Sequence, residues 1–268
     1  MEASAASKPA GRLAGLGLRL AYDRRVVVPD LSVEIPDGGF TIIVGPNACG
    51  KSTLLKALSR TLKPEAGTVL LEGAPIDSYR SKAVARQLAM LPQSPIAPES
   101  ITVRDLVARG RYPHQGLLRQ WSAADERAVT GALESTASME LADRYVAELS
   151  GGQRQRVWIA MVLAQQADLL LLDEPTTFLD IAHQYEVLEL CSRLHAEGRT
   201  LVAVLHDLNQ AARYATNLVV MKEGRIVAEG DPREVLTAAL VEEVFGLPCV
   251  IIPDPEAGTP LVVPKVPA

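Results

Sequence analysis

A glycine-rich stretch between an apolar run and a helix constrains this chain more than any other feature. Residues 45–53 read GPNACGKST and fit the pattern G-x-x-x-x-G-K-[ST]. Residues 40–44 before it are mostly apolar, and leucines recur on one side of the stretch that starts at Lys51. Such a strand–loop–helix unit wraps backbone amides around an anion and points the N-terminal amides of the helix at it. The sequence therefore predicts a phosphate-binding loop at the end of a buried strand.

The residues of this loop predict how a nucleotide is held. Gly45 and Gly50 let the backbone approach the phosphates closely. We expect Lys51 to contact the β- and γ-phosphates and the hydroxyl of Ser52 to bind Mg²⁺. An ordinary glycine turn before a helix is the alternative for this stretch taken alone, and two further motifs argue against it.

The first of these motifs is LLLLDEP at residues 169–175. Four leucines that end in two carboxylates indicate a buried parallel strand with a site at its tip. On a strand, Asp173 and Glu174 would face opposite ways, which suits two separate tasks. We expect Asp173 to hold Mg²⁺ through water and Glu174 to act as general base on the attacking water. A surface pair of acids is the alternative, but a charge at the end of a buried run needs a partner such as a metal.

The second motif is LSGGQ at residues 149–153. A serine and two glycines ahead of a helix form a natural place to receive a phosphate. From these residues alone, a serine N-cap with a flexible turn is the commoner interpretation.

Elsewhere strands and helices alternate, as in an α/β protein. Alternating patterns at residues 16–20 and 31–35 predict half-exposed antiparallel strands. Residues from about 94 to 150 are polar and helical, and we interpret them as an inserted helical subdomain. The predicted organisation is one domain over residues 11–250, followed by a short C-terminal extension at residues 251–268.

Local signals predict three further elements. The helix from Lys51 should continue to Leu62, where Lys63 and Pro64 end it. Residues 218–228 should form a hairpin. Asp231 and Pro232 should open a single short helix that reaches about residue 245.

Composition and charge narrow the function class. The formal net charge of −5 gives no support for nucleic-acid binding. No run of eighteen apolar residues appears, so no membrane span is expected, and residues 1–10 lack the pattern of a secretory signal. The three cysteines are odd in number and widely separated, which favours a reducing compartment. We expect a cytosolic protein.

The three motifs, in this order and at these spacings, resemble the ATP-binding-cassette (ABC) ATPase family. The resemblance covers residues 13–245. It implies an ATPase with ATP and Mg²⁺ as cofactors and an α/β fold: a P-loop NTPase core (RecA-like) with an antiparallel β-subdomain and an inserted α-helical subdomain. The loop residues that it assigns to nucleotide binding are Gly45, Pro46, Asn47, Ala48, Cys49, Gly50, Lys51, Ser52 and Thr53.

The resemblance also assigns roles outside the loop. Tyr22 matches the residue that stacks on adenine, with a core or surface aromatic as the alternative. Gln93 matches a glutamine that reaches Mg²⁺ and links the site to the helical subdomain. His206 matches a histidine that contacts the γ-phosphate, and Asp180 a position that communicates across a dimer. The resemblance places Ser150 and Gly152 on the γ-phosphate held by a second copy of the chain, and it includes Gly151 and Gln153 among the nucleotide-binding residues.

Three stretches are similar to one branch of the family, the ATPase subunits that import iron–siderophore chelates. They are ARGRYPHQ at residues 108–115, TTFLDIAHQ at 176–184 and HDLNQA at 206–211. The resemblance implies an energy-coupling ATPase at the cytoplasmic face of the membrane, docked on permease subunits near Gln93 and residues 109–115 and working indirectly with an extracytoplasmic solute-binding protein. Taken individually, Arg109 and Arg111 are better explained as a solvated helix end.

Alternatives remain at this stage. Cobalamin or haem could be the cargo of the same kind of subunit. A soluble ABC ATPase acting on DNA or ribosomes is the rival of another class, although it normally needs a long coiled coil or a second cassette. A P-loop kinase does not explain residues 149–153.

Two loop residues raise separate expectations. Ala48 stands where many relatives have glycine, and alanine would be strained there if the position requires a positive φ. Cys49 precedes a helix whose dipole favours a thiolate, which predicts a reactive thiol that bound ATP protects. Cys191 is expected to be an inert core residue.

Overall fold

A six-stranded sheet, ordered β10-β9-β3-β8-β7-β6, forms the centre of the molecule. The structure is a computed structural model that describes residues 11–116 and 121–266, so the expectation about a signal at residues 1–10 lies outside the described residues. Neighbouring strands run parallel except β9 and β10, which form the predicted hairpin. The strands are β3 (Phe40–Val44), β6 (Leu88–Leu91), β7 (Leu169–Asp173), β8 (Thr200–Val204), β9 (Asn217–Lys222) and β10 (Arg225–Gly230).

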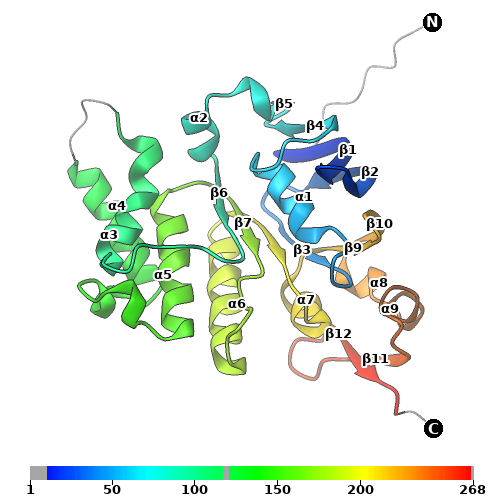
Figure 1. Ribbon diagram of the computed structural model, residues 1–268. Helices are drawn as coiled ribbons and strands as arrows, with labels where there is room; N and C mark the ends of the chain where they lie inside the picture. The colour runs from blue at the N-terminus through cyan, green and yellow to red at the C-terminus, as the bar shows by residue number, and fades with distance from the viewer. Residues whose placement is uncertain (1–10, 117–120, 267–268) are drawn as a thin grey trace, which may run out of the picture.

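Helices cover this sheet, which explains why its central strands are mostly apolar (Figure 1). Every residue of β3, β7 and β8 is buried, as expected when both faces of a parallel sheet are covered. Along β7, the leucines alternate between two hydrophobic clusters: Leu170 and Leu172 belong to one, Leu169 and Leu171 to the other. The helices that complete the two layers are α1 (Lys51–Leu58), α5 (Gly151–Ala164), α6 (Ile181–Ala196) and α7 (Leu208–Tyr214).

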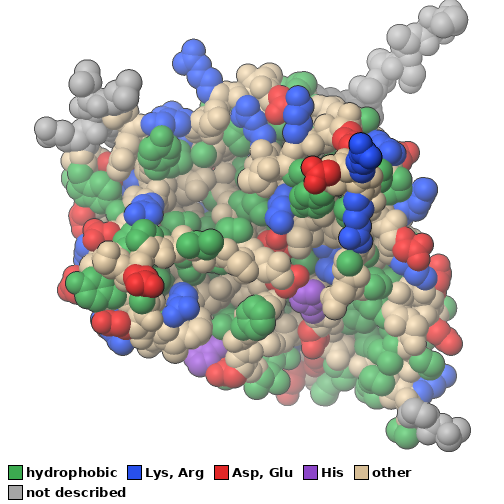
Figure 2. All heavy atoms as spheres, viewed as in Figure 1, with side chains coloured by type: hydrophobic (Ala, Val, Ile, Leu, Met, Phe, Trp, Pro, Cys, Tyr) green, Lys and Arg blue, Asp and Glu red, His purple; other side chains and the backbone are tan. Residues whose placement is uncertain are grey.

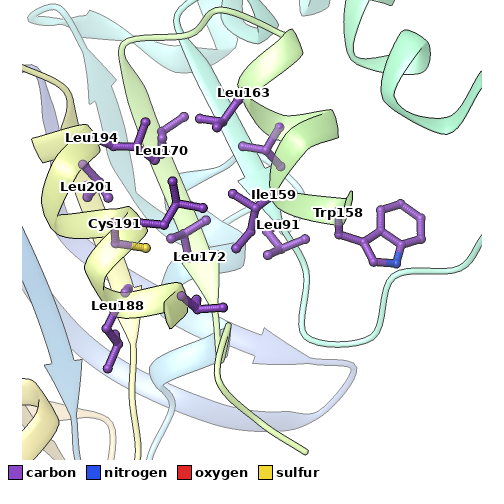
Figure 3. Packing of buried hydrophobic residues seen from close by; sticks show 14 of the residues in the cluster. Leu91, Trp158, Ile159, Leu163, Leu170, Leu172, Leu188, Cys191, Leu194 and Leu201 are labelled. Carbon is purple, nitrogen blue, oxygen red and sulfur yellow. The ribbon is translucent and has the colours of Figure 1, made fainter. Parts of the chain in front are cut away.

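One of these clusters joins α5 and α6 to the sheet. Figure 3 shows Leu170 and Leu172 of β7 between Ile159 of α5 and Leu188 of α6. Cys191 lies in the same cluster with no exposed surface, and burial raises the pKa of its thiol to about 12. The expectation that Cys191 is an inert core residue is therefore confirmed.

A second, antiparallel sheet packs beside α1. Its strand order is β2-β1-β4-β5, with β1 (Leu13–Tyr22), β2 (Arg25–Ile35), β4 (Ala66–Leu71) and β5 (Ala74–Pro75). The predicted alternation is wrong at Leu16, which is 40% exposed, because the register of β1 shifts between Gly15 and Leu18 around the positive φ of Gly17.

Short helices make up the lobe between β6 and β7, at the left of Figure 1. They are α3 (Val103–Ala108), the 3₁₀ turns Arg109–His114, Met139–Leu141 and Val146–Glu148, and α4 (Ala123–Ser135). Together with α5 they enclose a single apolar interior that continues into the core of the parallel sheet. With the two sheets, this lobe gives the predicted fold class.

Arg111 is not solvated, so that expectation is wrong. The residue is 4% exposed, and its Nε atom donates to Oδ1 of Asp125 over 2.9 Å. Its Nη1 atom donates to the carbonyl of Ala164 and to Gln166. The guanidinium therefore ties the 3₁₀ turn Arg109–His114 to α4 and to the end of α5. Arg109, by contrast, is exposed as expected.

Two predicted helices have different bounds. α1 ends at Leu58 rather than Leu62, because Arg60 adopts a φ of 63° and turns the chain out of the helix. The helix predicted from residue 231 to 245 is interrupted: α8 (Pro232–Val235) ends before Leu236, and Thr237 caps a new helix, α9 (Ala238–Phe245). A buried Leu236 between the two helices fixes the break.

The C-terminal extension forms a hairpin that the sequence did not predict. β11 (Cys249–Pro253) pairs with β12 (Pro260–Pro264), and the Asn209 side chain of α7 both accepts from the backbone nitrogen of Val262 and donates to its carbonyl. An isolated two-stranded hairpin is marginally stable, so this contact anchors it. Shorter elements are the 3₁₀ turn Ile76–Ser78 and α2 (Ser81–Ala85). Over the described ranges, none of the helices combines the length and the apolar character that a bilayer span requires.

Candidate functional site

The loop between β3 and α1 has the geometry of an anion-binding turn. Gly45 has a φ of 156°, and a side chain there would lie 2.2 Å from the carbonyl oxygen of Met221. Gly50, the N-cap of α1, has a φ of 108° that a side chain would strain. Both predicted glycine positions are therefore required by the backbone. Lys51 is buried, and its Nζ atom donates to the carbonyls of Gly45 and Pro46 over 2.8 and 2.9 Å, so its charge lies at the centre of the loop.

Ala48 adopts a positive φ, the conformation that we expected to be strained for alanine. Its φ is 61°, in the left-handed region where a Cβ atom costs about 1–2 kcal/mol. The side chain is exposed, so the cost comes from the backbone and not from a collision. The loop of this chain therefore carries strain at one position.

Ser52 and Asp173 meet at the base of the loop. The Ser52 hydroxyl donates to Oδ1 of Asp173 over 2.7 Å, and Asp173 is 1% exposed. Within the described part of the chain, Oδ2 of Asp173 has no hydrogen-bond partner although it is buried. Burial raises the pKa of Asp173, and the hydrogen bond from Ser52 opposes this. A hydroxyl beside a buried carboxylate with an unused oxygen fits Mg²⁺, which prefers oxygen ligands.

Glu174 leaves the strand instead of continuing it. The strand β7 ends at Asp173, and Glu174 has a φ of 54°, so strand alternation does not describe the pair. The positive φ still separates the two carboxylates: Asp173 faces Ser52, whereas Glu174 faces three other side chains. The two carboxylates are separated as predicted, but the turn of the chain at Glu174 separates them and strand alternation does not.

Three donors surround the Glu174 carboxylate. Gln93 Nε2 and Thr177 Oγ1 donate to Oε2 over 2.6 and 3.0 Å, and His206 Nε2 lies 2.8 Å from Oε1. Burial alone would raise the pKa of Glu174, but the hydrogen bond and charge of His206, with Thr177 and Gln93, lower it overall. Gln93, for which the resemblance implies a contact with Mg²⁺, donates to Glu174 in this structure.

A cavity of about 360 Å³ opens beside the loop. Tyr22, which is 44% exposed at the end of β1, forms part of its wall together with Glu174 and His206. Arg25 and Val27 also line it, and sequence reasoning missed both. Arg25 pairs directly with Tyr22 across the tight turn between β1 and β2, a pairing that the structure shows and the sequence analysis did not predict. Figure 2 shows basic side chains gathered over this end of the molecule, around α1 and the β1–β2 sheet.

Residues 150–153 form the start of α5 and do not line the cavity beside the loop. Ser150 accepts from the backbone of Gln153, and the Gln153 side chain accepts from the backbone of Ser150, which confirms the N-cap interpretation. Ser150 and Gly151 are exposed. Gly152 is buried, and a Cβ atom there would lie 2.5 Å from the ring of His183. This motif is therefore a preformed helix start that the chain does not bring to its own loop.

Asp180 caps α6 close to that helix start. Its carboxylate accepts from the backbone nitrogen of His183 and lies 2.7 Å from His183 Nδ1. Phe178, 94% exposed, and the exposed Ile181 flank it. The stretch around Asp180 thus presents apolar side chains to the surroundings.

The expectation of an activated Cys49 is wrong. The residue is buried, and its burial raises the pKa of the thiol despite the nearby charge of Lys51. Desolvation of the sulfur therefore outweighs the electrostatic attraction expected at a helix start.

Comparison with known proteins gives consistent matches. A model of the family described as ABC transporter matches residues 28–177. The chain is 58% identical over 254 residues to the ferric enterobactin transport ATP-binding protein FepC of Escherichia coli, with 94% of each chain covered. It is 54% identical over 248 residues to YusV of Bacillus subtilis, a "probable siderophore transport system ATP-binding protein", with 92% of this chain and 90% of that protein covered. A solved structure, a metal-chelate type ABC transporter in an inward-facing conformation, superposes with a TM-score of 0.82 at 28% identity, covering 96% of this chain and 98% of that one.

Proposed function

The chain belongs to the ABC transporter family, as its motifs predicted, and on this premise we propose that it couples ATP hydrolysis to the import of ferric siderophores. It is an ABC-type ATPase, with ATP as its substrate and Mg²⁺ as its cofactor. The two relatives, each more than half identical to this chain, are named for ferric enterobactin transport and siderophore transport. Those names support the cargo class, while the hydrolytic role is supported by the site itself.

The observation that carries the hydrolytic role is the Glu174 cluster beside the phosphate loop. We assign the loop amides and Lys51 to the β- and γ-phosphates, because their charge and donors converge there. Ser52 and Asp173 are the residues that would hold Mg²⁺. When bound, Mg²⁺ neutralises charge that develops on the phosphate oxygens.

Glu174 is proposed as the base that accepts a proton from the attacking water. Its lowered pKa keeps the carboxylate ionised, so it can accept a hydrogen bond from the water, and the position of the carboxylate rather than its basicity favours the proton transfer. Gln93 and Thr177 occupy Oε2, which fixes the orientation of the carboxylate. His206 holds Oε1 and, because its side chain is exposed towards the cavity, is placed to contact the terminal phosphate as well.

The base of the nucleotide is proposed to stack on Tyr22. The phenol ring lines the cavity at the side of the antiparallel sheet, and stacking on an aromatic face accepts a planar base. Arg25, paired with Tyr22 across the turn, adds a positive charge to the same wall, where it can meet a phosphate or the ribose.

The start of α5 is proposed to serve the site of a second copy of the chain. Ser150 and Gly151 are exposed, and the helix start offers free backbone amides and a positive dipole end. Because these residues do not line the cavity of their own loop, a second copy is needed to bring the two halves together. Asp180, flanked by exposed Phe178 and Ile181, would lie at the same contact.

The helical lobe is proposed as the docking surface for permease subunits. A hollow of about 310 Å³ lies between residues 95–99 and the α5 residue Trp158. Residues 95–99 follow Gln93 closely in the sequence. A second hollow is lined in part by Arg109, Tyr112 and Gln115. These residues belong to the segment 109–115, for which the resemblance implies permease docking. Figure 2 shows hydrophobic side chains spread over this lobe. Docking there would hold the chain at the cytoplasmic face of the membrane, with a solute-binding protein on the other side.

The hydrolytic role is tested by two variants with different expected failures. Glu174→Gln should bind ATP and Mg²⁺ as before while turnover falls by roughly 10²–10⁴-fold. Lys51→Ala should fail at nucleotide binding, because the phosphates lose their charged partner. Near-normal turnover in Glu174→Gln would remove Glu174 from the mechanism.

The transport role is tested separately by co-purification. An ATPase subunit of an importer should co-purify with an integral membrane protein, whereas a soluble ATPase that acts on DNA or ribosomes should not.

A further inference from the structure

Two glutamines connect the segment after His206 to the loop after Glu174. Gln210, on α7, is 5% exposed, and its Nε2 atom donates to Oε1 of Gln184 over 2.7 Å. Gln184, on α6, in turn donates through Nε2 to the carbonyl of Leu179 over 3.0 Å. Both glutamines lie in stretches that resemble the siderophore-import branch, at residues 176–184 and 206–211. The sequence analysis assigned no role to either glutamine.

Each end of this connection reaches the reacting groups. The backbone nitrogen of Gln210 donates to Oδ1 of Asp207, which caps α7 and directly follows His206. Leu179 lies in the loop that begins at Thr177, whose hydroxyl donates to Glu174. Since His206 also lies 2.8 Å from Glu174, the contacts close into a ring.

The two side-chain amides do more than pack α6 against α7. A bond that served only to pack α6 against α7 would join the two helices and stop there. Here the last donor goes to a main-chain carbonyl in the loop before Asp180, so the loop is held as well as the helices. Breaking the link between the two side chains leaves the buried amide of Gln210 without its partner, which is unfavourable, so the native arrangement is preferred.

We propose that Gln184 and Gln210 are positioning residues that hold residues 177–180 in register with the His206 segment, so that Glu174 stays aligned with the attacking water. The inference rests on the function proposed above for Glu174 and His206. Neither glutamine lines the cavity beside the phosphate loop, so neither is expected to contribute to the binding of ATP.

The test replaces the amides with an unbranched apolar side chain of similar size. Gln184→Met and Gln210→Met, in the full chain, should each lower kcat by about tenfold while leaving KM for ATP within about twofold, because alignment and not binding is lost. The double variant should be no slower than the single variants, since all three break the same link. Its thermal stability should partly recover, because no buried amide is left facing an apolar partner.

A matched control is available at Gln165, whose Nε2 atom donates to the carbonyls of Ala85 and Leu88 away from the Glu174 cluster. Gln165→Met should lose stability without losing kcat. The inference is wrong if the double variant has wild-type kcat, if KM rises while kcat is unchanged, or if Gln165→Met slows turnover as much as the paired glutamine variants do.

Glu174→Gln, measured alongside, separates this inference from the proposed function. If it abolishes turnover while the glutamine variants do not, only the positioning role fails. If it turns over normally, the assignment of Glu174 itself is wrong.

Discussion

Glu174 owes its place in the site to one backbone torsion. A non-glycine residue with a φ of 54° is uncommon, and such conformations persist only where the surroundings enforce them. Here Gln93, Thr177 and His206 all bind the carboxylate. The sequence predicted that Asp173 and Glu174 lie at the end of a buried strand. It did not predict that the chain turns at Glu174, because a strained backbone torsion leaves no trace in a strand pattern.

Ala48, in the phosphate loop, also has a left-handed torsion, and its replacement by glycine gives a prediction with a definite sign. Ala48→Gly should stabilise the chain, or tighten nucleotide binding, by up to about 1 kcal/mol, because glycine adopts a φ of 61° without a Cβ penalty. Ala124→Gly, at an exposed helical position of α4, is the matched control and should destabilise. Denaturant unfolding and ATP titration measure both variants. A loss of stability in Ala48→Gly would show that the torsion is not a source of strain.

Cys49 illustrates a case where burial overrides a local rule. Because its pKa is raised, maleimide should modify Cys49 more slowly than an exposed free cysteine at neutral pH, and bound ATP should slow it further. Mass spectrometry of labelled peptides, with Cys49→Ser as the control, follows the reaction. Rapid labelling of Cys49 in the nucleotide-free chain would contradict the buried placement.

At the scale of elements, the motif-bearing strands and helices were predictable, and the connections were not. The mostly apolar run of β3 and the four leucines of β7 predicted buried strands. The spacing of Ser150 and Gln153 predicted a capped helix. The break between α8 and α9 and the C-terminal hairpin were missed, because both depend on tertiary partners: Leu236 is buried, and Asn209 binds Val262.

The helical lobe depends on a buried ion pair that gives it a pH-dependent stability. Hydrogen bonds from Ser122 and then Arg111 lower the pKa of Asp125 to about 2 from 3.8. A depressed pKa stabilises the folded state above the unfolded value, and that contribution is lost as pH falls towards the folded value. Between about pH 4.5 and pH 3, wild type should therefore lose more stability than Asp125→Asn, as read from urea midpoints. Parallel losses in both would exclude Asp125 as the source.

At the scale of the molecule, each chain holds a phosphate loop and, away from the cavity beside that loop, the exposed and capped start of α5. This division predicts that ATP binding assembles two copies. Glu174→Gln, which should retain ATP, is expected to elute at doubled mass in size-exclusion chromatography with ATP and Mg²⁺. Adding Ser150→Ala should weaken the assembly, because the helix loses its capping side chain at the contact. A monomer at saturating ATP would contradict the two-copy site.

Coupling of ATP hydrolysis to iron–siderophore import is the central claim, and uptake in cells tests it most directly. Radiolabelled ferric siderophore, cobalamin and haem are supplied to cells that carry either the wild-type chain or Glu174→Gln. The account predicts that the variant loses ferric siderophore uptake and keeps the other two. Unchanged siderophore uptake alongside lost cobalamin or haem uptake would contradict the cargo assignment, and unchanged uptake of all three would contradict the transport role itself.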